Sequence, residues 1–379
     1  MKVVIAPDSY KESLTAMEVA SAIERGFKQV MPDACYVKLP MADGGEGTVQ
    51  ALVEATGGKV VSASVMDPLG RATDGFYGLL GDDETAVIEM AAASGLHLVD
   101  EGERNPLITT TYGTGQLIKA ALDAGSTHII IGIGGSATND GGLGMVQALG
   151  AKCLDKQGVE LPFGGGSLSE LASIDLTALD PRLCHVTLEI ACDVDNPLCG
   201  SKGASQVFGP QKGATPDMVE TLDANLAHYA DVIEKTTGRK VVNFPGAGAA
   251  GGLGAAFLGL FDVTLRPGIE IVIDAVNLHD AVKDADLVIT GEGKIDSQTI
   301  HGKTPVGVAR VAKQHQVPVI AIAGCVSADH KVVHQHGIDA VFSVVPGAVD
   351  LATALQDAKR NVEITSRNVA AVFSLRRLG

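Results

Sequence analysis

The chain has 379 residues, of which 46% are hydrophobic and 20% charged, so it is a globular protein long enough for two domains. Its net charge of −16 excludes a protein that grips nucleic acid through clustered basic residues. Six scattered cysteines without a C-x-x-C pair indicate reduced thiols, as expected in the cytoplasm.

The first elements follow a repeated pattern of a β-branched strand, a loop rich in Gly and Asp, and an amphipathic helix. Residues 2–6 are expected to form a strand, and residues 36–39 a second one. A capping box at Thr15 and Glu18 opens a helix that runs to about residue 30. Residues 42–48 lead into a helix that ends at Gly57-Gly58.

The middle of the chain has a different order of elements. Residues 59–66 and 72–80 flank a turn and predict a hairpin. A strand over 86–90, a helix over 115–124 and a strand over 128–133 follow. The uncharged stretch 241–261 is long enough to span a membrane, but it contains Asn243, Pro245 and several glycines. We expect it to form a ligand loop or a tightly packed turn that runs into a buried helix over 249–260, and no membrane span.

The initial pattern returns near the end of the chain. Residues 287–290, 319–323 and 340–345 are expected to be strands, and Pro305 opens a helix. Alternating strands and helices predict an α/β fold with a doubly wound parallel sheet. We expect residues 1–66 and 280–379 to form one domain and residues 67–279 to form an inserted α/β domain with a mixed sheet. One contiguous sheet is the alternative.

Four polar loops follow expected strands, where open α/β sheets bind their ligands. They cover residues 8–11, 43–46, 291–296 and 324–325. Each loop alone is compatible with an ordinary turn, but three of them carry carboxylates, two of them beside lysine. The candidate residues are Asp8, Ser9, Lys11, Asp43, Glu46, Glu292, Lys294 and Asp296.

A glycine-rich tract over residues 131–142 is the best candidate for a phosphate-binding loop. It follows an Ile-rich strand and precedes an expected helix over 143–149. Glycine amides, hydroxyls and a helix N-terminus could together bind an anion. A packing turn is the alternative interpretation. The residues expected to bind phosphate are Gly134, Gly135, Ser136, Thr138 and Asn139.

Four further kinds of pattern are weaker. Gly132-x-Gly134-x-x-Ala137 and Gly246-x-Gly248-x-x-Gly251 resemble dinucleotide fingerprints, which are unspecific in a glycine-rich chain. Gly302-Lys303-Thr304 resembles the end of a Walker A loop, but Ser297 stands where that motif requires its first glycine. We therefore expect Lys303 only to bind a phosphate or a carboxylate. Asp193, two residues before Asp195, suits Mg²⁺ or a general base, and a simple turn is the alternative. His330, His334 and His336 have spacing that could bind a metal, although a structural role is more common.

Several of these segments together resemble the bacterial glycerate kinase family. The matching segments include APDSYKESL from Ala6, MADGGEGT from Met41, GIGGSATNDGG from Gly132, CDVDNPL from Cys192, FGPQKGA from Phe208 and VITGEGKIDSQT from Val288. The resemblance implies two α/β domains, one of them flavodoxin-like and discontinuous. It also implies ATP-dependent phosphorylation of D-glycerate to 2-phosphoglycerate.

Phosphoryl transfer needs a clamp for the phosphates, a divalent ion and an oriented hydroxyl. The expected Mg²⁺ ligands are Asp193 and Glu292, and Asp43, Asp193 and Asp296 compete as the base. Residues expected to bind substrate are Asp8, Ser9, Lys11, Glu46, Lys294 and Lys303. Formation of 3-phosphoglycerate, an NAD-dependent hydroxy-acid dehydrogenase and a non-catalytic anion sensor are the alternatives. The sequence leaves the oligomeric state, including a homodimer, open.

Overall fold

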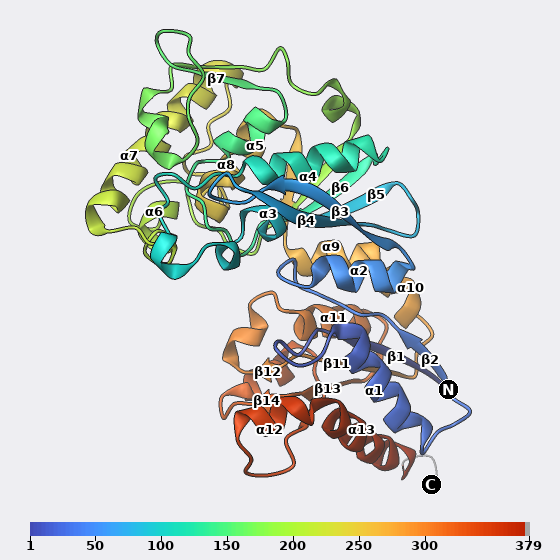
Figure 1. Cartoon of the computed structure of the whole chain (residues 1–379). Coiled ribbons are helices and arrows are strands. Elements are labelled where there is room, and N and C mark those ends of the chain that lie inside the picture. The colour runs from blue at the N-terminus through green and yellow to red at the C-terminus, as the bar shows by residue number, and fades with distance from the viewer. Residues whose placement is uncertain (376–379) are drawn as a thin grey trace. The chain divides into compact units, whose positions relative to one another are not determined.

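The computed structural model describes residues 1–375 and divides the chain into two compact units (Figure 1). Unit 1 comprises residues 1–43, 50–58 and 267 onward, and unit 2 comprises residues 44–49 and 59–266. These bounds differ from the expected ones for two reasons. Residues 59–66 pair with a strand of unit 2, and residues 267–282 contribute helices that pack within unit 1.

Unit 1 is built around a five-stranded parallel sheet in the order β2-β1-β11-β13-β15. The strands are β1 (Lys2–Pro7), β2 (Cys35–Lys38), β11 (Leu287–Gly291), β13 (Val319–Ala323) and β15 (Ala340–Ser343). Numbered along the chain, this is the 2-1-3-4-5 order of flavodoxin-like folds. The predicted doubly wound sheet is therefore confirmed, and the alternative of one contiguous sheet is wrong.

The central strands of unit 1, β1, β11 and β13, are largely buried on both faces, as is typical of a parallel sheet, whereas the edge strands β2 and β15 are partly exposed. Val3 and Ile5 pack in one core with helices α1 (Ala16–Lys28) and α13 (Ala358–Leu375). Val4 points to the opposite face and is equally buried. The two helices touch at Gly26, where a Cβ atom would lie 2.7 Å from the Cβ of Ser366. The predicted capping box is present, since Glu18 N donates to Thr15 and Thr15 N to Glu18.

Shorter elements complete unit 1. They are α2 (Thr48–Thr56), which begins in unit 2, α9 (Gly268–Ala275), α10 (Leu278–Val282), β12 (Lys294–Ile295), η6 (Ser297–Ile300), α11 (Thr304–Gln314), β14 (Cys325–Val326), η7 (His330–His336) and α12 (Leu351–Gln356). Helix α11 packs against β1 and β11 and begins close to the carboxyl ends of these strands.

Unit 2 contains a six-stranded mixed sheet in the order β10-β9-β6-β5-β4-β3. Its strands are β3 (Lys59–Met66), β4 (Ala72–Leu79), β5 (Thr85–Glu89), β6 (His128–Gly132), β9 (Thr187–Ala191) and β10 (Val263–Arg266). Strands β5, β6, β9 and β10 are parallel, whereas β3 and β4 form the predicted antiparallel hairpin. This mixed sheet agrees with the fold expected for the second domain.

The remaining elements of unit 2 are mostly helical. They are α3 (Ala91–Ser94), η1 (Leu96–Leu98), η2 (Glu101–Glu103), α4 (Tyr112–Asp123), α5 (Leu143–Ala148), β7 (Lys152–Leu154), η3 (Gly165–Glu170), β8 (Ser173–Asp175), η4 (Pro181–His185), α6 (Ala204–Phe208), η5 (Pro210–Lys212), α7 (Pro216–Thr237) and α8 (Ala249–Leu260). Helix α8 is interrupted, because Ala250, Gly251 and Gly252 are left-handed. Within residues 1–375, no helix has the length and apolar character needed to cross a membrane.

Candidate active site

Two carboxylates stand side by side at the carboxyl edge of the unit 1 sheet. Pro7 of β1 is the register partner of Gly291 of β11, so the next residues, Asp8 and Glu292, leave adjacent strands at the same level. The amide of Asp8 also donates to the carbonyl of Gly291 at 2.8 Å. These strands flank the point where the strand order reverses, which is where open α/β sheets bind ligands.

Asp8 is held by donors from two segments. Its Oδ1 accepts a hydrogen bond from the amide of Ser9 at 2.6 Å, and its Oδ2 accepts one from the hydroxyl of Thr304 at 2.5 Å. Burial raises the pKa of Asp8 to about 6, and the negative charge of Asp43 acts in the same direction. Asp8 and Asp43 therefore belong to one acidic cluster within unit 1.

Glu292 is the more deeply buried of the pair, with 9% of its surface exposed. Thr299 donates to its Oε1 at 2.5 Å, and the ammonium of Lys303 lies 3.6 Å from its Oε2. Burial raises the pKa of Glu292 to about 7, and the charges of Asp8 and Asp296 add to this, although Thr299 and Lys303 oppose it. This carboxyl group can therefore exchange a proton near neutral pH.

Asp296 has a different environment from Asp8 and Glu292. It caps η6 by accepting from the amide of Gln298 at 2.9 Å, and it pairs with Lys294 at 3.1 Å. Burial raises the pKa of Asp296, but the hydrogen bonds from Lys294 and Gln298 outweigh burial and hold this pKa below its usual value. Asp296 thus shares the cluster with Glu292 as a stable anion.

Ser9 and Lys11 lie on either side of an anchored tyrosine. The hydroxyl of Tyr10 donates to the carbonyl of Ile322 at 2.7 Å, and burial together with the charge of Glu292 raises the pKa of Tyr10. The loop thereby stays against the ends of β11 and β13, with Lys11 exposed. Sequence reasoning missed the partners Thr299 and Thr304, although Thr304 directly follows the Lys303 that it singled out.

The acidic cluster suits a divalent cation only in part. Within the described residues, no group of three or more His, Cys, Asp and Glu side chains could hold a metal ion. The carboxylates of Asp8 and Glu292 still fit Mg²⁺, which commonly takes one or two carboxylates and completes its shell with phosphate oxygens and water. Two histidines of η7 have structural partners, since Nδ1 of His330 contacts the Ser327 carbonyl and Nδ1 of His334 contacts that of Ile338, and His336 is exposed.

In unit 2 the glycine-rich tract begins at the carboxyl end of β6. Only Gly134 and Gly135 are exposed, and Ser136 through Asp140 are buried. Among residues 1–375, the amides of Gly134 and Gly135 donate to no protein acceptor. These two amides, together with the hydroxyl of the adjacent Ser136, could bind a phosphate group. Thr138 and Asn139 are fully buried and support the loop from behind.

Neither glycine fingerprint has the geometry of a dinucleotide site. After Gly135 the chain forms a bridge between Gly95 and Ser136, and it stays buried from Ser136 until α5 begins at Leu143. The second pattern precedes α8 but follows turns, with no strand before it. A dinucleotide site needs a strand that turns directly into a helix.

The loop over residues 44–48 packs on the same edge of unit 2. A Cβ atom on Gly132 would lie 2.4 Å from the carbonyl oxygen of Gly44. Glu89, at the end of β5, accepts from the amide of Val49 at 2.8 Å and also from the amides of Gly47 and Thr48. Glu46 is exposed on this loop. Sequence reasoning did not single out Glu89, which anchors the loop.

Asp193 lies just beyond β9, whose last residue Ala191 is the register partner of Gly132. Asp193 is therefore exposed at the edge that carries the glycine-rich tract. It belongs to unit 2, whereas Glu292 belongs to unit 1, so joint coordination of one ion by these residues stays a prediction.

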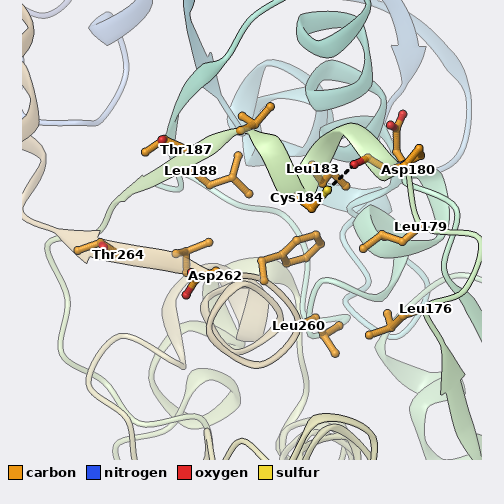
Figure 2. A pocket seen from close by; sticks show the side chains of 14 residues that line it. Leu176, Leu179, Asp180, Leu183, Cys184, Thr187, Leu188, Leu260, Asp262 and Thr264 are labelled. Carbon is orange, nitrogen blue, oxygen red and sulfur yellow. Dashed lines mark hydrogen bonds between the residues drawn. The ribbon is translucent and has the colours of Figure 1, made fainter.

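A hollow of about 680 Å³ lies at the opposite, amino-terminal end of β9 and β10 (Figure 2). Leucines, Phe261 and two carboxylates, Asp180 and Asp262, line it. The thiol of Cys184 donates to the carbonyl of Pro181 at its rim. None of the predicted site residues lines this hollow, so it is separate from the candidate chemistry.

Comparison with known proteins identifies the family of the chain. The glycerate kinase family model matches residues 3–374. A Bacillus subtilis protein named glycerate kinase is 62% identical, covering 99% of this chain and 98% of its own. The Escherichia coli glycerate 2-kinase is 58% identical over 99% and 98% of the two chains. A crystal structure from Salmonella typhimurium LT2, assigned as glycerate kinase 2, covers both chains fully at 58% identity with a TM-score of 0.93.

Proposed function

Because this chain belongs to the glycerate kinase family, we infer that it is a phosphotransferase that acts on an alcohol group. We propose that it transfers the γ-phosphoryl group of ATP to the 2-hydroxyl of D-glycerate in the presence of Mg²⁺. The choice of the 2-hydroxyl is supported by the resemblance to the Escherichia coli protein, which is named glycerate 2-kinase.

The observation that carries the proposal is the pair of carboxylates at the strand-order reversal of unit 1. Asp8 and Glu292 follow register partners on adjacent strands, and Lys303 lies 3.6 Å from Glu292. Carboxylates combined with a lysine can accept a proton, bind a cation and orient an anionic hydroxy acid. An anion receptor would gain nothing from so many acidic groups.

The resident residues would divide the work as follows. Asp8 and Glu292 would hold Mg²⁺, which when bound would neutralise charge on the transferring phosphoryl group. Asp193 stays a proposed further ligand. Lys294 and Lys303 would bind the glycerate carboxylate, together with Ser9 and Lys11. Glu46 stays a proposed contact of the substrate and, as a carboxylate, would accept from a glycerate hydroxyl.

The phosphates of ATP would bind the loop formed by residues 134–138, through the free amides of Gly134 and Gly135. Exposed glycine amides at a strand end are a recurrent way to bind phosphate. The loop is firm, because the amide of Ala137 donates to the carbonyl of Ser94 at 2.9 Å. Ser136 adds a hydroxyl, and the buried Thr138 and Asn139 keep the loop in shape.

Asp43, Asp193 and Asp296 stay the candidates for the base that accepts the substrate proton. Within unit 1 we favour Asp43, because Asp296 already caps η6 and pairs with Lys294. A base whose lone pairs are engaged and whose pKa is lowered is a weak proton acceptor.

The direct test is a coupled assay of ADP release with D-glycerate and Mg-ATP, followed by phosphorus NMR of the product. We expect 2-phosphoglycerate. L-glycerate and NAD⁺ without ATP serve as controls, and the second of these also tests the dehydrogenase alternative. Release of 3-phosphoglycerate would show that the 3-hydroxyl is phosphorylated instead. If no ATP is consumed, the proposal is wrong.

We further propose a cytoplasmic location, because all six cysteines are free thiols in the structure, as a reducing compartment requires. The net charge of −16 supports the expectation that nucleic acid is not a partner. A homodimer stays open as a prediction.

A further inference from the structure

Lys212 is the most deeply buried cation in the described part of the chain, with 2% of its surface exposed. Its ammonium donates to the hydroxyl of Ser136 at 2.6 Å and to the carbonyl of Thr138 at 2.7 Å. Both acceptors belong to residues 134–138, which we name the phosphate loop. Lys212 lies 74 and 76 residues away along the sequence, so sequence spacing gave no sign of this contact.

The backbone that carries Lys212 is fixed. Its amide donates to the carbonyl of Gly209 at 2.9 Å at the end of η5. The next residue, Gly213, has a φ of +90°, and a Cβ atom there would lie 2.4 Å from the carbonyl oxygen of Arg104. The turn therefore holds the backbone of Lys212 in place, and the side chain is buried against the loop.

The buried ammonium is incompletely compensated. An ammonium has three donors, and only two of those on Lys212 have acceptors within residues 1–375. Nor does the described chain give it an ion pair. Asp140, the one titratable neighbour whose charge acts on Lys212, is occupied by its own donors, Thr111, Gly142 and Gly144. A buried charge is costly, so an anion bound to the loop would stabilise the charged form of Lys212.

Two buried oxygen atoms are also without hydrogen-bond partners within residues 1–375, namely Oγ1 of Thr138 in the loop and Oδ1 of Asn139 directly after it. The loop thus combines free amides on its exposed side with unsatisfied groups and a cation on its buried side. A rigid packing turn would need neither.

We propose that Lys212 is a positioning residue for the phosphate loop. Its positive charge lies on the buried side of the loop and is neutralised when a polyphosphate binds to the amides of Gly134 and Gly135. This rests on the proposed function, because it assigns the phosphate loop to ATP. Lys212 acts through Ser136 and Thr138, so it sets the loop conformation and adds an attractive field without touching the substrate glycerate.

The first test compares Lys212→Gln with Lys212→Met in the full chain. Glutamine keeps an amide donor for the loop and removes the charge, whereas methionine removes both. Calorimetric titration with ADP, and separately with inorganic tripolyphosphate, should show affinity reduced by about tenfold or more for glutamine and further for methionine. Thermal stabilisation by D-glycerate should stay near the wild-type value. Lys156→Gln, at an exposed lysine of unit 2, is the matched control.

These readouts separate the inference from the proposed function. If the wild-type protein phosphorylates glycerate and Lys212→Gln binds ADP and tripolyphosphate as tightly as wild type, the role of Lys212 is overturned while the function stands. If the wild-type protein does not use ATP, the proposed function fails first. A variant that loses affinity for glycerate and ADP equally would indicate a merely structural lysine and would also overturn the inference.

A second measurement needs no variant. Burial lowers the pKa of Lys212 to about 7, whereas Asp140 acts in the other direction. Arg104 packs nearby through its backbone, and its Nη1 donates to the carbonyl of Gln211 at 3.5 Å. In protein labelled with ¹³C at lysine Cε, one signal should titrate near neutral pH and move upward by about one pH unit or more with saturating ADP. An unchanged titration would overturn the proposal.

Discussion

Asp8 and Glu292 leave two adjacent parallel strands directly after a register pair, Pro7 and Gly291, so the fold places two acids side by side. The charge of Asp8 contributes to the raised pKa of Glu292, whose main cause is burial. Like charges at such short range are tolerated where a proton, a lysine or a metal ion compensates them. The protonation of these two carboxylates should therefore affect both the activity and the stability of the protein.

Activity should fall on the acid side. Asp8 has a pKa of about 6 and Glu292 one of about 7, so both lose their negative charge as the pH drops through this range. If both must be ionised, kcat/KM for glycerate should fall by about tenfold per pH unit or more below about pH 6. Initial rates from about pH 5 to about pH 9 test this. A flat profile down to about pH 5 would show that neither charge is needed.

Replacing Glu292 by glutamine should stabilise the fold at alkaline pH while it impairs activity. The folded pKa of Glu292, about 7, exceeds the ordinary value of 4.5, so the folded state binds more protons between these values. Stability is therefore lost as the pH rises from about 4.5 to about 7. Glu292→Gln should raise the free energy of unfolding at about pH 8 by roughly 2 kcal/mol.

Denaturant unfolding at about pH 5 and about pH 8 measures this effect. Glu270→Gln is the matched control, because Glu270 is a more exposed acid of unit 1, paired with Arg310 at 3.2 Å. The control should change stability little at either pH. A Glu292→Gln protein with the same pH dependence as wild type would contradict the assignment of the proton to Glu292.

Thr304→Val should shift the acid limb of the activity profile. Thr304 is fully buried and donates to Asp8 at 2.5 Å, which lowers the pKa of that carboxyl group. Valine has nearly the same shape and no donor, so the pKa of Asp8 should rise by about one unit and the limb should move to higher pH. Thr299→Val should act on Glu292 in the same way. If the pH profiles of both variants match that of the wild type, the ionisation of Asp8 and Glu292 does not control activity.

Asp43→Asn should reduce kcat far more than Asp296→Asn. A base that accepts the substrate proton contributes about 10²–10⁴-fold, so Asp43→Asn should lose that factor with little change in the KM for ATP. Asp296→Asn should cost about tenfold or less, because asparagine can still cap η6. The coupled assay with both variants decides, and the reverse order of losses would make Asp296 the base.

The sequence predicts the parts of this molecule that local patterns determine. Thr15 and Glu18 show a capping box within four residues, and the hairpin of β3 and β4 is visible from its turn. The doubly wound parallel sheet follows from short β-branched strands that alternate with helices, whereas the flavodoxin-like fold is implied by the family resemblance. Each of these signals lies within a short stretch of sequence, so it can be recognised without knowing the tertiary contacts.

Other features depend on contacts between distant segments. Lys212 meets Ser136 across 76 residues, and Thr304 meets Asp8 across 296. Glu89 anchors a loop that lies 40 residues before it. The alternation of strands predicts that residues 8 and 292 share an edge. It does not say which threonine or lysine will complete the cluster, because that depends on helix packing and side-chain reach.

The interruption of α8 is also invisible in the sequence, yet it supports the phosphate loop. Gly251 has a φ of +68°, and a Cβ atom there would lie 2.0 Å from the carbonyl oxygen of Thr138 and 2.6 Å from the Cα of Asn139. The carbonyl of Gly251 accepts from the amide of Gly141 at 3.0 Å. The backbone of α8 therefore touches the buried side of the loop, where a side chain has no space.

Gly251→Ala should accordingly destabilise the fold and weaken ADP binding together. Gly57→Ala is the matched control, because Gly57 has a similar φ of +72° and a Cβ atom there would meet nothing within 4 Å. The control carries only the backbone cost of about 1 kcal/mol, whereas Gly251→Ala should cost at least about 3 kcal/mol, because backbone must move. Thermal unfolding and ADP titration measure both effects. Equal losses in the two variants would show that close packing against Thr138 does not shape the loop.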